Sequence, residues 1–329
     1  MIDLLRFFAA SWVALFHFNS YVPFRSNWYR IIVHEGKLGV PLFFVISGYC
    51  INYATNHADG PWTFFVKRIF RIYPPYWFSI MVVLFSLFCY RLYYGGNPVH
   101  LPKTLSAILA TISLFTDPLA KVTPVNIVYW TLTYEIFFYL TIFIVLFFPK
   151  KHHVYWLIII TASVLILPLH NYWLLFFLQY WPSFCLGVVT YKLLHDHKSQ
   201  LFAKSVLLLL CLIALSFKSV ELKYTITCII SALLIMYNHY KPIRENVLSR
   251  FGDYSYSIYL LHVPVGITVL GFVKQLQIVQ TNIYLNIFWD ISLFIFIIWL
   301  SKLSFVYIEL RGIKCGKRFI NKYLGSHSK

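Results

Sequence analysis

LLRFFAASWVALFHFNSYV, residues 4–22, is a nineteen-residue stretch whose only Lys, Arg, Asp or Glu is Arg6. A helix of about 20 predominantly apolar residues crosses the hydrocarbon layer of a bilayer, which is about 30 Å thick. Similar stretches recur along the chain, which is 60% hydrophobic and 20% aromatic but only 12% charged, with a mean hydropathy of +0.70. Soluble domains carry about twice that share of charge. The sequence therefore predicts an all-α integral membrane protein with no room for a separate soluble domain.

Ten stretches are predicted to span the membrane as helices, and they cover most of the chain. They are Leu4–Val22, Leu38–Tyr53, Tyr73–Leu92, Asn126–Phe148, Val154–Leu169, Trp173–Leu194, Phe202–Phe217, Tyr224–His239, Tyr254–Val273 and Tyr284–Leu300. An eleventh candidate, Thr104–Phe115, is short and rich in Ser and Thr. It could be a full span, a re-entrant segment or an interfacial segment.

The distribution of basic residues decides between ten and eleven spans, because cytoplasmic loops of membrane proteins are enriched in Lys and Arg. With a cytoplasmic N-terminus, ten spans place 19 of the 28 basic residues on the cytoplasmic side, whereas eleven spans place only 8 there. We therefore expect a polytopic bundle of about ten spans with both termini in the cytoplasm. Residues 1–310 would form the transmembrane domain, and residues 311–329 a short basic cytoplasmic tail.

Several classes of protein and site are disfavoured by the same sequence. The net charge of +17 does not indicate a nucleic-acid partner, because the basic residues lie in short clusters between apolar stretches. The six cysteines have no metal-like or redox-like spacing, so we expect reduced packing residues and no metal. The N-terminal stretch lacks a small-residue cleavage site, so we expect it to remain as the first helix and not to act as a signal peptide.

Arg6 and His17 are the ionisable pair of the first span. They are eleven residues apart, close to three turns of helix, so both side chains project from one face with a rise of about 16 Å between them. Arg6 would lie near the cytoplasmic interface, where a lone arginine can simply snorkel to the lipid headgroups. His17 would reach the outer half of the bilayer. It could be a packed, hydrogen-bonded histidine, but polar groups at that depth usually mark a site or a pathway.

Two further groups of polar residues lie in or beside later spans. Glu135, in WTLTYEIFFY at 130–139, is an intramembrane carboxylate that shares a helix face with Tyr139, and its alternative role is a structural ion pair. Arg68 and Arg71 precede IYPPYW at 72–77 and would share a face if this stretch is helical. Paired guanidinium groups suit phosphate oxygens, although a basic anchor that contacts lipid headgroups is the simpler interpretation from composition.

Small and hydroxyl-bearing residues complete the set of candidates. Ser47 and Gly48 are small residues in the middle of the second span. Gly48 is suited to close helix packing, and the Ser47 hydroxyl to a hydrogen bond within the bundle. Ser255 and His262 belong to DYSYSIYLLH at 253–262, where the hydroxyls could all be satisfied between helices. Trp130 is one of several aromatic residues near predicted span ends.

Together these segments resemble the acyltransferase 3 family of bacterial membrane proteins. The matching pieces are Arg6 and His17 separated by ten residues, FFVISGY at 43–49, the arginines before IYPPYW, WTLTYEIFFY, and SYSIYLLHVP at 255–264. They occur in family order and span nearly the whole chain. Thr131 stands where serine is common in the family, which keeps the hydroxyl.

The resemblance implies an O-acetyltransferase of the bacterial inner membrane. Its donor would be cytoplasmic acetyl-CoA, and its acceptor a hydroxyl of a lipid-linked or polymeric glycan such as O-antigen, capsule or another surface polysaccharide. Arg68, Arg71 and Arg6 would hold the phosphates of acetyl-CoA, and His17, oriented by Glu135, would be the general base.

The remaining candidates, Ser47, Trp130, Tyr139, Ser255 and His262, would contact substrate or support these groups. A covalent acyl-histidine or acyl-tyrosine relay stays open at this point. So does a translocator that moves an acyl group or small anion without transferring it, since buried ionisable residues also line transport paths. Membrane lipid is an expected partner on any of these interpretations, and the oligomeric state is open.

Overall fold

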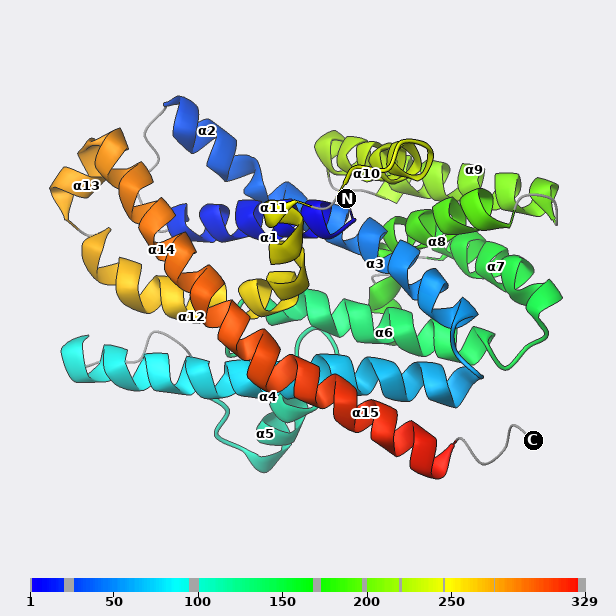
Figure 1. The fold of residues 1–329 in the computed structure, drawn as a ribbon, viewed down its shortest axis with the longest axis horizontal. Helices are drawn as coiled ribbons and strands as arrows, with labels where there is room; N and C mark the ends of the chain where they lie inside the picture. Colours follow the sequence, from blue (N-terminus) through cyan, green and yellow to red (C-terminus); the bar gives the residue numbers. More distant parts are fainter. Residues whose placement is uncertain are drawn as a thin grey trace.

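The computed structural model describes residues 2–20, 27–94, 101–167, 173–196, 200–218, 221–244, 246–274 and 276–324. Within these ranges the chain forms helices and no strands, which confirms the all-α prediction (Figure 1). Predicted span ends at Val22 and Leu169, and the end of the basic tail, fall outside the described residues.

The helices fall into a long and a short group. The long helices are α1 (Ile2–Asn19), α3 (Gly39–Asn56), α4 (Pro61–Tyr94), α6 (Tyr129–Val145), α7 (His153–Ile166), α8 (Trp181–His195), α9 (Leu201–Lys218), α10 (Leu222–Tyr240), α12 (Ser255–Val273), α14 (Ile283–Ser304) and α15 (Leu310–Tyr323). The short ones are α2 (Trp28–His34), η1 (Glu35–Leu38), α5 (Leu105–Ile112), η2 (Lys150–His152), η4 (Trp173–Gln179), α11 (Val247–Arg250), η5 (Phe251–Tyr254), α13 (Gln277–Thr281) and η6 (Phe305–Glu309).

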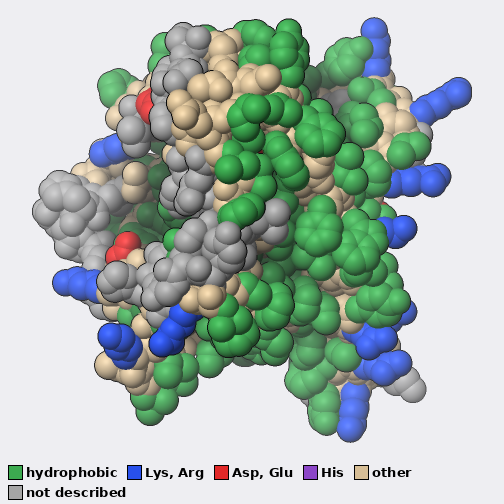
Figure 2. Space-filling model, turned by 90° about the vertical axis from the view of Figure 1, so that its left-hand side faces the viewer, with side chains coloured by type: hydrophobic (Ala, Val, Ile, Leu, Met, Phe, Trp, Pro, Cys, Tyr) green, Lys and Arg blue, Asp and Glu red, His purple; other side chains and the backbone are tan. Residues whose placement is uncertain are grey.

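Each predicted span overlaps one of the long helices, and the disputed segment Thr104–Phe115 contains only the eight-residue helix α5. Among the described residues, four segments are long and apolar enough to cross a membrane: Trp28–Asn56, Pro61–Leu92, Leu201–Lys218 and Ile283–Tyr323. Hydrophobic side chains also cover much of the face seen in Figure 2. The chain thus has the character of a membrane protein, while the number of ten spans and the cytoplasmic termini stay predictions.

Helix bounds differ from the predicted spans at three places. Helix α4 begins at Pro61, well before the predicted start at Tyr73, and continues through Pro74 and Pro75. The predicted span Trp173–Leu194 is divided into η4 and α8, because Pro182 occupies the first turn of α8, a position that suits its missing amide hydrogen. The predicted boundary at residue 310 falls within a continuous run from α14 through the π-helical turn η6 into α15.

Helices α3 and α8 approach so closely that only glycine fits at two points. A Cβ atom on Gly48 would lie 1.8 Å from the Phe184 carbonyl oxygen, and one on Gly187 would lie 2.0 Å from the Val45 carbonyl oxygen. Small residues allow this approach between membrane helices, where lipid supplies no hydrophobic driving force for association. The two glycines therefore fix the position of α3 and of Ser47, which precedes Gly48.

A buried polar network joins α1, α2 and α14 at the end of the molecule that carries α2 and α13 (Figure 1). Asp290 of α14 is fully buried and forms an ion pair of 2.8 Å with Lys274. Asn19 Nδ2 donates to the Asp290 carboxylate at 2.8 Å, and the Tyr29 hydroxyl donates to it at 2.5 Å. A buried ion pair needs such additional hydrogen bonds to offset its desolvation. The network holds the end of α1 against α14.

Candidate functional site

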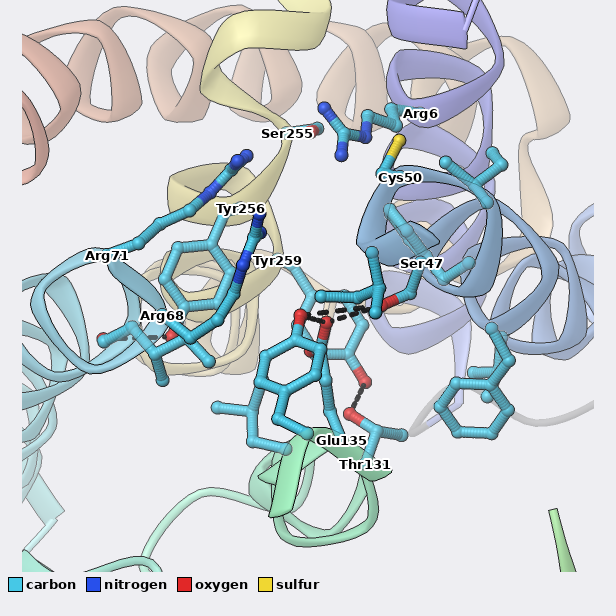
Figure 3. A pocket seen from close by; sticks show the side chains of 18 residues that line it. Arg6, Ser47, Cys50, Arg68, Arg71, Thr131, Glu135, Ser255, Tyr256 and Tyr259 are labelled. Atoms are coloured by element: carbon cyan, nitrogen blue, oxygen red, sulfur yellow. Dashed lines mark hydrogen bonds between the residues drawn. The ribbon is translucent and has the colours of Figure 1, made fainter. Parts of the chain in front are cut away.

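A cavity of about 100 Å³ lies between α1, α3, α4, α6 and α12 (Figure 3). We call it the arginine cavity. Its polar lining residues are Arg6 of α1, Ser47 and Cys50 of α3, Arg68 and Arg71 of α4, Thr131, Glu135 and Tyr139 of α6, and Ser255, Tyr256 and Tyr259 of α12. Seven of the predicted site residues, from five helices, therefore line one space.

Positive charge converges on this cavity. Arg68 and Arg71 are one turn apart on α4, and Arg6 reaches the cavity from α1 (Figure 3). Arg6 has Asp3 at 3.4 Å, whereas none of the ion pairs found in the described residues includes Arg68 or Arg71. Arg68 Nε is buried without a hydrogen-bond partner there. Guanidinium groups gathered in this way are suited to binding an anion.

The Arg68 guanidinium is held by aromatic rings. It lies 5.8 Å from the centre of the Phe64 ring and 5.9 Å from that of Tyr139, within the range of cation–π attraction. Such contacts fix the plane of the guanidinium without using its N–H groups. Those donors stay available to a ligand.

Glu135 is hydrogen-bonded inside the arginine cavity. Its carboxylate accepts from the Ser47 hydroxyl at 2.8 Å and from the Tyr139 hydroxyl. The structure thus brings together three residues that the sequence placed on two separate spans. These bonds come from neutral donors, so they hold the carboxylate in place without cancelling its charge.

A second, larger cavity of about 410 Å³ contains His17. We call it the histidine cavity. Aromatic side chains supply much of its lining, and Gln179 adds an amide; the aromatic residues are Phe16, Trp130, Tyr180, Tyr224 and Tyr259. Val40 and Tyr259 line both cavities, so they form the partition between them.

Two ion pairs lie at or near the histidine cavity, and the residues of the first line it. Lys37 of η1 contacts Glu221 at 2.8 Å, and Glu35 of η1 contacts Lys223 of α10. Lys37 lowers the pKa of the Glu221 carboxyl, and Glu35 raises the pKa of Lys223, as expected for opposite charges in contact. The pairs tie η1 to the start of α10.

The expected contact between His17 and Glu135 is absent from the structure. The two residues line different cavities, and no hydrogen bond joins them among the described residues. The ring beside His17 is that of His262, whose centre lies 5.2 Å away. Helical periodicity correctly placed Glu135 and Tyr139 on one face, but it could not predict which residue of another helix lies opposite His17.

Other residues of the site were missed by sequence reasoning. Tyr259, which lines both cavities, shares a hydrogen bond of 2.7 Å with the Thr131 hydroxyl. It was missed because an aromatic residue in an apolar span is usually a packing residue. Cys50 was interpreted as a packing residue but lines the arginine cavity. Glu309, in the π-helical turn η6, lines neither cavity; it is 1% exposed, accepts from the Ser257 hydroxyl at 3.4 Å and lies near enough to Arg71 and Arg6 for their charges to act on it. In the part of the chain that is described, no three His, Cys, Asp or Glu residues are placed to hold a metal ion.

Comparisons with known proteins give the chain a family. The acyltransferase 3 model, described as "Acyltransferase domain", matches residues 1–306. "Nodulation protein 10" of Rhizobium leguminosarum bv. viciae is 28% identical over 155 residues, which are 43% of this chain and 42% of that protein. "Putative acetyltransferase ORF330" of Acidianus two-tailed virus is 27% identical over 291 residues, 78% of this chain and 80% of that protein. No solved structure matches significantly.

Proposed function

The chain belongs to the acyltransferase 3 family, and from this premise we propose that it transfers an acetyl group from cytoplasmic acetyl-CoA to a hydroxyl of a carbohydrate acceptor. The acceptor we propose is a surface glycan such as O-antigen, capsule or another polysaccharide, modified at the bacterial inner membrane. The family supports acyl transfer in general. The acetyl donor and the glycan acceptor are supported by the chemistry of the two cavities.

The observation that carries the donor assignment is the convergence of Arg6, Arg68 and Arg71 on one cavity. Coenzyme A carries phosphate groups, and guanidinium groups bind phosphate oxygens by charge-assisted, often bidentate hydrogen bonds. The cavity, at about 100 Å³, is too small for the whole coenzyme. In our proposal the phosphates bind the arginines at its mouth, and the thioester arm extends toward the partition.

The acceptor assignment rests on the histidine cavity. Trp130, Tyr180 and Tyr224 line it with aromatic side chains, and Gln179 adds an amide. A sugar ring has apolar C–H faces and a hydroxyl rim, so a pocket with aromatic walls and a few polar groups suits it. His17 lines the same cavity, which supports our assignment of it as the group that deprotonates the acceptor hydroxyl.

In the proposed reaction His17 acts as general base. The imidazole takes the proton of the acceptor hydroxyl as its oxygen attacks the thioester carbonyl. The new C–O bond forms, the C–S bond breaks, and the leaving thiolate of coenzyme A recovers the proton from the imidazolium. The thioester carbonyl must pass Val40 and Tyr259 to meet the hydroxyl, because these residues separate the two cavities.

The donor site is tested by binding of coenzyme A to the purified full-length protein. Arg68→Gln and Arg71→Gln each remove a charge-assisted contact worth about 1.5–3 kcal/mol, so we expect Kd to rise about tenfold or more. Lys67→Gln is the matched control, because Lys67 lies on the same turn of α4, donates to the His57 carbonyl and is not part of the cavity lining. Equal affinities in all three variants would refute the donor site.

Transfer itself is tested with labelled acetyl-CoA and membranes that carry the host's surface glycans. We expect a glycan-bound ester that mild alkali releases, and no ester with His17→Ala. Activity of His17→Ala equal to wild type would refute the base assignment. A translocator would instead move label across sealed vesicles without forming the ester.

A further inference from the structure

His262 is a fully buried histidine whose ring lies beside that of His17. Its exposed fraction is 0%, and its ring centre is 5.2 Å from that of His17 and 5.7 Å from that of Tyr259. It comes from α12, whereas His17 comes from α1. The two histidines therefore meet across a helix interface at the inner wall of the histidine cavity.

One nitrogen of His262 has a defined role. Nδ1 lies 3.1 Å from the carbonyl oxygen of Ile258, one turn earlier on α12. A carbonyl oxygen can only accept, so Nδ1 carries the hydrogen of this bond. In a neutral imidazole the other nitrogen is then a bare acceptor.

That second nitrogen, Nε2, is buried and has no hydrogen-bond partner among the residues described. Leaving a buried acceptor unsatisfied costs about 1–3 kcal/mol, so a group without a partner needs an explanation. The Tyr259 hydroxyl does not fill this role, since it is engaged with the Thr131 hydroxyl at 2.7 Å and the Val128 carbonyl at 3.3 Å. The ring of His17 is the remaining donor-bearing neighbour seen in ring contact with His262.

The distance between the rings suits a direct bond. Two imidazoles joined edge to edge by an N–H···N bond of about 3 Å have centres roughly 5 Å apart, and the observed spacing is 5.2 Å. The rings are inclined at 42° and are not hydrogen-bonded in this conformation. For the bond to form, an N–H of the His17 ring has to turn toward His262 Nε2.

We propose that His262 is a positioning residue that sets the tautomer of the catalytic base. His262 Nε2 accepts the N–H of His17, which leaves the other nitrogen of His17 unprotonated toward the histidine cavity, where it can take the proton of the acceptor hydroxyl. This inference rests on the proposed role of His17 as general base. It replaces Glu135, which lines the other cavity, as the group that orients His17.

The test compares two replacements of His262 in the full-length protein. His262→Gln keeps an acceptor oxygen at the end of a side chain of similar length, whereas His262→Leu keeps bulk but removes the acceptor. General base catalysis contributes about 10²–10⁴-fold, so we expect His262→Leu to lower kcat by at least about tenfold. The KM for acetyl-CoA should be unchanged, and His262→Gln should restore most of kcat. A structural role alone predicts instead that both variants lose activity in step with their thermal stability.

A second measurement does not require activity. In ¹⁵N-histidine-labelled protein, the resonances assigned to His17 by their loss in His17→Ala should show one tautomer in wild type and a mixture in His262→Leu. A mixture already present in wild type, or kcat of His262→Leu within twofold of wild type, overturns the inference. If wild type forms no ester while its single His17 tautomer is lost in His262→Leu, the proposed function fails and the histidine pair stands.

Discussion

Replacing Gly48 by alanine tests whether α3 and α8 approach each other as closely as the structure shows. The new Cβ atom would lie 1.8 Å from the Phe184 carbonyl oxygen, and Cβ atoms keep at least 3.0 Å from such neighbours, so the helices must separate by at least the difference, 1.2 Å. Gly187 makes the reciprocal approach on α8, where a Cβ atom would lie 2.0 Å from the Val45 carbonyl oxygen.

The expected cost follows from what the methyl group meets. Overpacking costs about 1–3 kcal/mol, and we expect about 2 kcal/mol or more because the obstacle is backbone and cannot rotate away. This lowers the ratio of folded to unfolded protein roughly 30-fold. Ser47 moves with α3, so its 2.8 Å hydrogen bond to Glu135 should also weaken.

The assay is thermal unfolding of the purified protein in one detergent. Gly266→Ala is the comparison variant, because its methyl group would meet the buried Phe18 ring at 2.8 Å and not a backbone atom. We expect Gly48→Ala to unfold several degrees below both wild type and the comparison variant. Equal midpoints for Gly48→Ala and wild type would show that the close approach of α3 and α8 is wrong.

Three further predictions concern the polar contacts. Asp290→Ala should destabilise the protein by about 3–5 kcal/mol, because it leaves the buried partner lysine unpaired. Asp290→Asn keeps the shape of the side chain and should destabilise it less. Equal unfolding midpoints for Asp290→Ala and wild type would contradict the network. Tyr139→Phe removes a hydrogen bond to the Glu135 carboxylate, which is then free to neutralise the neighbouring guanidinium groups. We therefore expect coenzyme A to bind about tenfold more weakly, measured by calorimetric titration. An unchanged affinity would refute this prediction. Lys37 lowers the pKa of the Glu221 carboxyl, so the ion pair stabilises the protein above the usual glutamate pKa and is lost as the pH falls through the lowered pKa. The small difference in unfolding midpoint between wild type and Glu221→Gln should therefore vanish at that acid pH. A difference that persists there would show that the ion pair is not its cause.

The fold was predictable where apolar runs decide it. Each predicted span has a helix, because a long apolar run in lipid must satisfy its backbone hydrogen bonds internally. The part left open was the beginning of α4, because Arg68 and Arg71 were expected to share a face only if their stretch is helical. The structure shows that the stretch is helical and that both arginines line the arginine cavity.

The candidate site was predictable as a set of residues but not as an arrangement. Arg6, Arg68, Arg71 and Glu135 were each identified by their charge in or beside an apolar stretch, and they share one cavity. Which groups touch depends on the rotation and depth of neighbouring helices, which single-helix periodicity does not contain. His17 consequently has His262 beside it where a carboxylate was expected.

The partition of Val40 and Tyr259 has a consequence for the proposed reaction. A continuous file of water through a membrane protein would dissipate a proton gradient, and these two side chains line both cavities at the point where a path between them would run. Tyr259 is 6% exposed, and its hydroxyl is hydrogen-bonded to Thr131 at 2.7 Å, which holds the ring in place. In the proposed transfer the acetyl group itself must therefore occupy the position of the ring while it moves.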